Sequence, residues 1–168
     1  MKHTDIIITK MLPDHWNAVA DIYKQGIATG MATFEKDVPS WDTWDANHIG
    51  TCRFIARSGE EVIGWAALSA VSSRCVYGGV AEVSVYVSTA HRGRGVGEML
   101  LRELIDQSEK LGYWTLQSGI FPENENSIHL HQKVGFRIIG FREKIGQLEG
   151  VWKNNVLMER RSKKEGLI

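Results

Sequence analysis

A glycine-rich segment between a strand-like run and a helix-like run is the part of this chain best suited to chemistry. Residues 80–87 have the pattern of a strand, a helix is expected from Val96, and Arg92-Gly93-Arg94-Gly95-Val96-Gly97 lies between them. Glycines allow backbone N–H groups to approach a ligand closely, and a helix N-terminus carries partial positive charge. The segment therefore predicts a site for a phosphate-bearing ligand, although a hairpin or a simple helix-entry turn also fits these glycines.

Two common nucleotide-binding motifs do not fit this segment. A Walker loop requires Gly-Lys-Ser/Thr, whereas Gly97 is followed by Glu98. A dinucleotide fingerprint requires an acid about 20 residues further on, and residues 114–118 contain none. A nucleotide-dependent kinase is thus disfavoured, and the spacing Arg/Gln-x-x-Gly-x-Gly, met by Arg92, Gly95 and Gly97, is what remains.

Glu82 is the single acid on the expected strand that leads into this segment. Because strand side chains alternate, Glu82, Ser84 and Tyr86 share one face, and the three valines at 83, 85 and 87 share the other. We expect the valines to face the core and the polar face to line a cleft. A carboxylate near the centre of a sheet is costly unless it is paired or functional. Glu82 is thus a candidate catalytic group, with a structural ion pair as the alternative.

A histidine on the last expected helix is the second candidate. His131 shares one helical face with Ser127 and Val134, so it should point inward, whereas His129 points elsewhere. This arrangement does not favour a two-histidine metal site, and a hydrogen-bonded core histidine is the alternative to a catalytic one. Asn124, at the start of the same helix, is expected to be its N-cap.

The remaining pattern predicts one mixed α/β domain over residues 1–168, with a short, solvated charged tail at 160–168. The expected closing strands lie around a turn at Gly146 and Gly150, and the expected element order is β-α-α-β-β-β-α-β-α-β-β. The expected strands cover residues 5–9, 53–57, 61–71, 80–87, 113–118, 136–144 and 151–159, and the expected helices follow Pro13, surround Trp41 and Trp44, and cover 96–111 and 124–134.

Composition narrows the possible functions. A formal net charge of +0 argues against a nucleic-acid partner, which would favour a basic excess. The two cysteines, Cys52 and Cys75, have no metal-site spacing and are too few for a disulfide framework, and no metal is expected. We find no signal peptide or membrane-spanning run, so the sequence predicts a cytoplasmic protein without a membrane partner.

Four ordered motifs resemble one enzyme family. The stretch 74–87 with the following glycine segment resembles the phosphinothricin N-acetyltransferase family of the GNAT superfamily. Residues 124–136 are similar to that family's Asn-x-x-Ser…Leu-His-Glu…Gly-Phe segment, with Gln132 where Glu is usual, and residues 32–35 and 150–152 match in kind and order. The resemblance spans nearly the whole chain. It implies a GNAT fold, an α/β fold with a mostly antiparallel sheet of six to seven strands, flanked by about four helices and splayed at the cofactor-binding strand.

The resemblance also implies a reaction: direct transfer of an acetyl group from acetyl-CoA to the amine of a small amino acid or analogue, such as phosphinothricin or methionine sulfoximine. A homodimer is implied as well. The implied cofactor-binding residues are Val85, Tyr86, Val87, Arg92, Gly93, Arg94, Gly95, Val96, Gly97, Glu98, Asn124 and Ser127.

The same resemblance implies catalytic roles for Glu82 and His131. Glu82 is the expected base, acting directly or through a water, and His131 the expected acid or proton relay, although the family's histidine has also been assigned as a base beside the glutamate. The implied substrate-binding residues are Phe34, Arg74, Tyr86 and Trp152.

Arg74 would hold a substrate carboxylate, because a guanidinium binds a carboxylate through two hydrogen bonds; a surface arginine is the alternative. Two other functions stay open. The chain could acetylate a polyamine, an aminoglycoside or a protein N-terminus, of which a cationic pocket disfavours the polyamine. It could also be a non-catalytic acyl-CoA-binding module, which would need the glycine segment but not Glu82.

Overall fold

The strand-like runs of the sequence form one seven-stranded sheet in the computed structural model, which describes residues 5–167. The order across the sheet is β1-β2-β3-β4-β5-β7-β6. β4 and β5 are parallel, and the other neighbouring strands are antiparallel. The strands are β1 (Ile6–Lys10), β2 (Arg53–Ser58), β3 (Glu61–Ala70), β4 (Val80–Val87), β5 (Thr115–Ile120), β6 (Arg137–Leu148) and β7 (Val151–Arg161).

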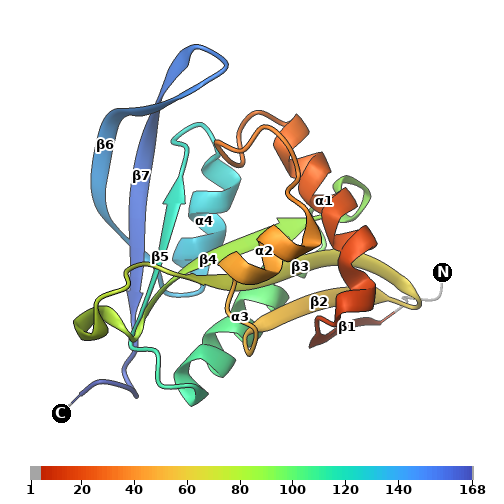
Figure 1. Ribbon diagram of the computed structural model, residues 1–168, viewed down its shortest axis with the longest axis horizontal. Coiled ribbons are helices and arrows are strands. Elements are labelled where there is room, and N and C mark those ends of the chain that lie inside the picture. Colours follow the sequence, from red (N-terminus) through yellow and green to blue (C-terminus); the bar gives the residue numbers. More distant parts are fainter. Residues whose placement is uncertain (1–4, 168) are drawn as a thin grey trace.

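Helices cover both faces of this sheet, as their apolar stripes predict (Figure 1). The helices are α1 (Trp16–Ala28), α2 (Trp41–Asn47), α3 (Val96–Lys110) and α4 (Glu125–Lys133), with short 3-10 turns at Pro13–His15, Cys75–Tyr77 and Thr89–His91. α3 buries Leu100, Leu101 and Leu104 against one face, and α1 and α2 pack Val19 and Trp44 against the other. Within residues 5–167, no helix has both the length and the apolar character required to cross a bilayer.

β4 separates from β5 partway along its length. The two strands pair from Val80↔Thr115 to Glu82↔Gln117, after which β4 continues to Val87 with β3 as its partner on the other side. Backbone groups of residues 83–87 that point toward β5 therefore have no partner in that strand. This opening confirms the splayed sheet expected from the sequence.

The closing hairpin differs from the expected one. β6 runs through Gly146 to Leu148, and the tight turn lies at Glu149 and Gly150, so the prediction of a turn at Gly146 was wrong. The pairing of β6 with β7 skips residues between Arg142 and Gly146 and then resumes. The backbone N–H of Lys144 donates instead to the Asn154 side chain at 2.8 Å. A side-chain acceptor thus replaces a strand partner, which apolar alternation does not reveal. The hairpin extends beyond the rest of the sheet (blue in Figure 1).

The C-terminal charged segment is anchored to the domain, contrary to the solvated tail expected from the sequence. Arg160 contacts the Glu109 carboxylate of α3 at 2.8 Å, and the buried Ser162 hydroxyl donates to the same carboxylate at 3.1 Å. Arg161 donates to the carbonyls of Glu165 and Gly166. The prediction failed because Glu109 is far away in sequence and supplies the counter-charge. Residue 168 lies outside the described part.

Replacing Glu109 by glutamine is expected to lower the free energy of unfolding by about 1–3 kcal/mol at neutral pH. Burial raises the pKa of Glu109, but Arg160, Ser162 and Lys164 outweigh it and hold the pKa below its ordinary value of 4.5. A lowered pKa stabilises the fold above that value, and the contribution disappears as the pH falls through the folded-state pKa. In urea unfolding, the two proteins should converge in acid; a difference that persists there would contradict this account.

Candidate active site

Two cavities meet where β4 leaves β5. The carboxylate cavity, about 460 Å³, contains Glu82 and lies between β4, β5, α4 and the β6–β7 hairpin. The glycine-loop cavity, about 580 Å³, lies between the end of β4 and the start of α3. The residues that line both are Ala32, Val85, Tyr86, Asn124 and Ser127. A ligand in one cavity can therefore reach a ligand in the other only past these shared residues.

The glycine-loop cavity has the geometry of an anion site. Gly95 is the N-cap of α3 with a φ of 78°, in the left-handed region that favours glycine. The first amides of α3 lack helical partners, and Gly93, Val96 and Gly97 line the cavity beside them. Of the two arginines of the loop, Arg92 lines this cavity, whereas the exposed Arg94 lines neither cavity.

The predicted contact residue Glu98 also lines the glycine-loop cavity, but its charge is compensated. Its carboxylate lies 2.8 Å from Lys133 of α4 and 2.9 Å from Arg102. Hydrogen bonds from Lys133 and Arg102 lower the pKa of Glu98, so the group is ionised but paired. Lys133 was not predicted, since its position depends on how α3 and α4 pack rather than on its own helix.

The open edge of β4 can bind an extended ligand. Val85, Tyr86 and Val87 line the glycine-loop cavity, on the part of β4 that β5 leaves unpaired. Unpaired strand groups bind amide-containing chains as an added strand would. The amides at the start of α3 and the unpaired backbone groups of β4 together fit a molecule that carries a diphosphate at one end and an amide-rich arm. Coenzyme A has this chemistry.

Asn124 joins two segments beside this edge. Its side-chain oxygen accepts from the Ser127 backbone N–H at 3.4 Å, as expected of an N-cap, and its amide nitrogen donates to the Met31 carbonyl at 3.3 Å. The N-terminus of α4 is thus held to the segment after α1 at the point where the cavities meet. The contact with Met31 is long-range and could not be predicted from the sequence.

Glu82 is half-buried in the carboxylate cavity, directly opposite Gln117 of β5. Burial raises the pKa of Glu82, while a hydrogen bond from Gln117 and the positive charge of Arg142 oppose that rise. Glu82 therefore holds a proton more readily than an ordinary glutamate does, which suits a group that must accept one.

His131 is 2% exposed and also lines the carboxylate cavity. Its Nδ1 lies 2.7 Å from the Ser127 carbonyl oxygen. Because a carbonyl can only accept, this contact assigns the proton to Nδ1 and leaves a lone pair on Nε2. Nε2 is buried and has no hydrogen-bond partner within residues 5–167. Burial lowers the pKa of His131, so the resting side chain is neutral at pH 7 and is a proton acceptor.

The structure brings some of the predicted substrate contacts into this cavity but not others. Phe34 and Tyr86 line it, whereas Arg74 and Trp152 line neither cavity. Arg74 is exposed, with its guanidinium 5.5 Å from the centre of the Tyr77 ring, and Trp152 is 55% exposed near the hairpin turn. Arg74 lies on the connection between β3 and β4, at the start of the 3-10 turn Cys75–Tyr77, and Trp152 is the second residue of β7. Within one chain, the arginine predicted to bind a carboxylate is therefore not at the site.

Several polar residues of the carboxylate cavity were not anticipated. The unpredicted polar residues that line it are Thr33, Gln117, Ser118, Arg142 and Asn155. Gln117 could have been found, because parallel pairing places it opposite Glu82. Arg142 and Asn155 face each other across β6 and β7, and that register depends on the hairpin irregularity.

The cysteines are poor candidates for covalent catalysis. Burial raises the pKa of Cys52 to about 12, and this side chain lies in the core beside α3. Cys75 is exposed, and neither thiol lines the carboxylate cavity or the glycine-loop cavity. In the part of the chain that the structure describes, no group of three or more His, Cys, Asp or Glu side chains is arranged to hold a metal ion.

Comparison with known proteins agrees with this geometry. Residues 16–136 match the acetyltransferase (GNAT) family. The protein YwnH of Bacillus subtilis (strain 168), whose name provisionally assigns it as a phosphinothricin acetyltransferase, is 31% identical over 150 residues, which cover 85% of this chain and 92% of YwnH. The crystal structure of a phosphinothricin acetyltransferase from Sinorhizobium meliloti in complex with AcCoA has a TM-score of 0.86 at 27% identity, covering 97% of this chain and 91% of that one.

A third relative has a more specific name. The L-methionine sulfoximine/L-methionine sulfone acetyltransferase of Salmonella typhimurium (strain LT2) is 37% identical over 78 residues. That match spans 46% of this chain and 46% of the relative. It covers less than half of each protein.

Proposed function

Because this chain belongs to the GNAT acetyltransferase family, we propose that it transfers the acetyl group of acetyl-CoA to the primary amine of a small amino acid or analogue. The observation that carries this proposal is the meeting of the two cavities at the open edge of β4, with Glu82 on one side and the glycine loop on the other. Relatives named for phosphinothricin and methionine sulfoximine support the acceptor class.

On the donor side, the amides of residues 93–98 and the Arg92 side chain would hold the diphosphate. Backbone groups of Val85, Tyr86 and Val87 would hold the amides of the pantetheine arm. When bound, acetyl-CoA supplies the acetyl group as a thioester. Asn124 and Ser127, which line both cavities, would flank the thioester end.

On the acceptor side, an ammonium must first lose a proton, because it has no lone pair with which to attack a thioester. Glu82 takes that proton, directly or through a water, and its raised pKa suits it to the task. His131 accepts a proton at Nε2 in the resting enzyme and can return one to the departing thiolate only after it has received it. The first proton of the ammonium goes to Glu82, which releases it to solvent. After the attack the nitrogen gives a second proton to Nε2 of His131, and His131 passes it to the departing thiolate, so His131 acts as a relay.

The acceptor class is tested by release of the coenzyme A thiol from acetyl-CoA in the presence of different amines. Methionine sulfoximine, phosphinothricin and free amino acids should each be compared with spermidine, an aminoglycoside and a short peptide. We expect acceptor-dependent release with the first group. Release only with the second group would reassign the acceptor, and coenzyme A binding without release for any amine would favour a non-catalytic acyl-CoA-binding module.

Replacing Gly95 by alanine is expected to weaken coenzyme A binding about 10-fold, or about 1.4 kcal/mol. Alanine in the left-handed region costs about 1–2 kcal/mol, so the loop should move away from that geometry and misplace its amides. Gly112, at the other end of α3, is the matched control. Its φ is 87° against 78° for Gly95, and a Cβ on either meets nothing within 4 Å.

Gly112→Ala should therefore lose similar stability to heat but keep its affinity for coenzyme A in calorimetry. Equal losses of affinity in the two variants would remove the assignment of the glycine loop as the diphosphate site.

Two further features belong to the proposal. Apolar side chains exposed on β6 and β7, including Phe141 and Trp152, support a homodimer, which sedimentation velocity would test; a monomer at all concentrations would contradict it. A cytoplasmic location is proposed from the sequence, and the absence of nucleic-acid binding stays a prediction from the net charge.

A further inference from the structure

Arg142 is the one lysine or arginine among the described residues that line the carboxylate cavity. Glu82 is the one acid there, and His131 is neutral at rest. The cavity thus offers a single fixed positive charge and a single negative charge. An amino acid in water carries the opposite pair, an ammonium and a carboxylate.

The strand register fixes the backbone position of Arg142, and its exposed side chain lies at the wall of the cavity. It lies on β6 directly opposite Asn155 of β7, and both line the cavity. Asn155 in turn approaches β5, because a Cβ on Gly119 would lie 3.0 Å from its side-chain nitrogen. Burial raises the pKa of Glu82, and the positive charge of Arg142 opposes that rise, as the Gln117 hydrogen bond does. Arg142 and Asn155 therefore form a polar wall across the cavity from Glu82.

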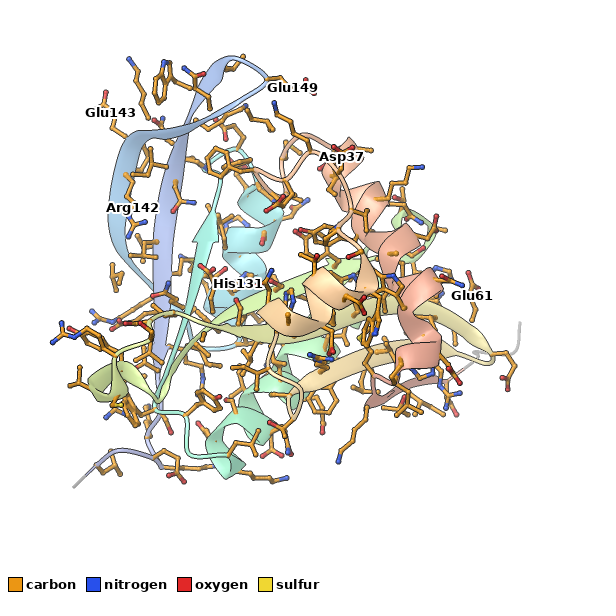
Figure 2. All side chains as sticks on the ribbon, in the orientation of Figure 1. Asp37, Glu61, His131, Arg142, Glu143 and Glu149 are labelled. Atoms are coloured by element: carbon orange, nitrogen blue, oxygen red, sulfur yellow. The ribbon has the colours of Figure 1, made fainter. Side chains whose placement is uncertain are left out.

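A β-bulge next to Arg142 indicates that this part of β6 belongs to a binding site. The register shifts between Arg142 and Gly146, and Lys144 adopts a φ of 46°, which is rare for a residue with a side chain. The Asn154 side chain holds this conformation by accepting from the Lys144 N–H at 2.8 Å. Bulges redirect side chains and gather near binding sites, as backbone strain does. Figure 2 labels Arg142 and Glu143 beside this bulge on β6.

Arg142 has no ion pair with any residue in the range 5–167, whereas neighbouring arginines do. Arg137, five residues earlier on β6, contacts Glu159 at 2.8 Å, and Arg160 of β7 contacts Glu109 at 2.8 Å. An unpaired guanidinium at a cavity wall remains free to bind a planar anion through two parallel hydrogen bonds.

We propose that Arg142 binds the carboxylate of the amino-acid acceptor while its ammonium faces Glu82. This inference rests on the proposed function and deepens it, because it makes the free carboxylate the feature by which the enzyme selects its acceptor. Arg142 takes the role that the family resemblance implied for Arg74, which lies outside the cavity. Acceptors with several amines and no carboxylate, such as polyamines, are disfavoured by the charge of Arg142.

The test compares two acceptors in two variants. Initial rates are measured for L-methionine sulfoximine and for its carboxamide, which keeps the amine but lacks the carboxylate. In Arg142→Gln, kcat/KM for the acid should fall about 10- to 100-fold, mainly through KM, as expected for loss of a charged hydrogen-bonded pair. The value for the carboxamide and the KM for acetyl-CoA should change less than about threefold.

Arg137→Gln is the matched control, since it removes an arginine from the same strand outside both cavities, and it should leave both acceptors unaffected. Arg142→Lys keeps the charge but not the paired hydrogen bonds, so it should lose activity with the acid alone, to a smaller extent. Arg142→Lys also tests the carboxylate contact if the glutamine variant does not fold.

The outcomes separate the two proposals. Equal losses of kcat/KM for the acid and the carboxamide would overturn the carboxylate contact. Arg142 would then act by adjusting the pKa of Glu82. Unchanged kinetics with both acceptors would overturn it as well, while leaving the acetyltransferase function intact. Failure of the unmodified enzyme to acetylate either acceptor, when other amines are acetylated, would overturn the acceptor class and the role of Arg142 together.

Discussion

Replacing Glu82 by glutamine is expected to lower kcat/KM for the amine acceptor by about 100- to 10,000-fold, the usual contribution of a general base. Glutamine has nearly the same shape but cannot accept a proton from an ammonium. Coenzyme A affinity should be unchanged, because Glu82 lies in the carboxylate cavity and not in the glycine-loop cavity. Steady-state rates of thiol release and calorimetric titration of coenzyme A measure the two quantities separately.

Loss of folding should not account for the effect. Burial raises the pKa of Glu82 above its ordinary value of 4.5, so the protonated carboxyl group stabilises the fold at low pH, and that contribution is lost as the pH rises through the folded-state pKa. The glutamine variant should therefore be at least as stable as the unmodified enzyme at neutral pH. Glu143→Gln, at an exposed position of β6 outside both cavities, is the control and should remain fully active. Near-normal turnover in Glu82→Gln would show that the base has been misassigned.

Replacing His131 by glutamine is expected to lower kcat/KM about 100-fold or more, within the range for a proton-transfer group. The variant loses the Nε2 lone pair that faces no other partner in the described chain. Figure 2 shows His131 on α4, whereas His129, two residues earlier, is exposed. His129→Gln is thus the matched control on the same helix. Equal activity of the two variants would return His131 to the role of a core histidine.

His131 should also leave a signature in the pH dependence of stability. Burial lowers its pKa below the ordinary value of 6.5. A lowered histidine pKa stabilises the fold above 6.5, and that contribution is lost as the pH falls through the folded-state value. The unmodified protein should lose stability to urea between neutral and mildly acidic pH, and His131→Gln should lose less. A matching pH dependence in both proteins would contradict the buried neutral state.

The glycine loop, Glu82 and His131 could be predicted because each depends on local patterns. Strand alternation places Glu82 on the cavity face, helical spacing turns His131 inward, and a glycine stands at the left-handed start of α3. The splayed sheet followed from the resemblance, and the pairing of β4 with β5, which ends at Glu82↔Gln117, confirms it.

The rest of the site depends on how distant strands pair and on charged residues that are close in space but far apart in the sequence. Arg142 reaches the cavity from a strand with a bulge that no apolar pattern indicates, and Lys133 is placed by the packing of α4 on α3. The charged C-terminal segment failed as a prediction for the same reason, since Glu109 is distant in sequence. Arg74 has the expected neighbours in the sequence, yet its local conformation leaves it exposed.

Direct transfer requires both substrates to be present together, one in each cavity, with the amine attacking the thioester past the residues that the two cavities share. Initial rates measured while both acetyl-CoA and L-methionine sulfoximine are varied distinguish this order of events from a covalent intermediate. Sequential binding predicts double-reciprocal lines that intersect. Parallel lines, the kinetic fingerprint of a covalent acyl-enzyme, would contradict direct transfer.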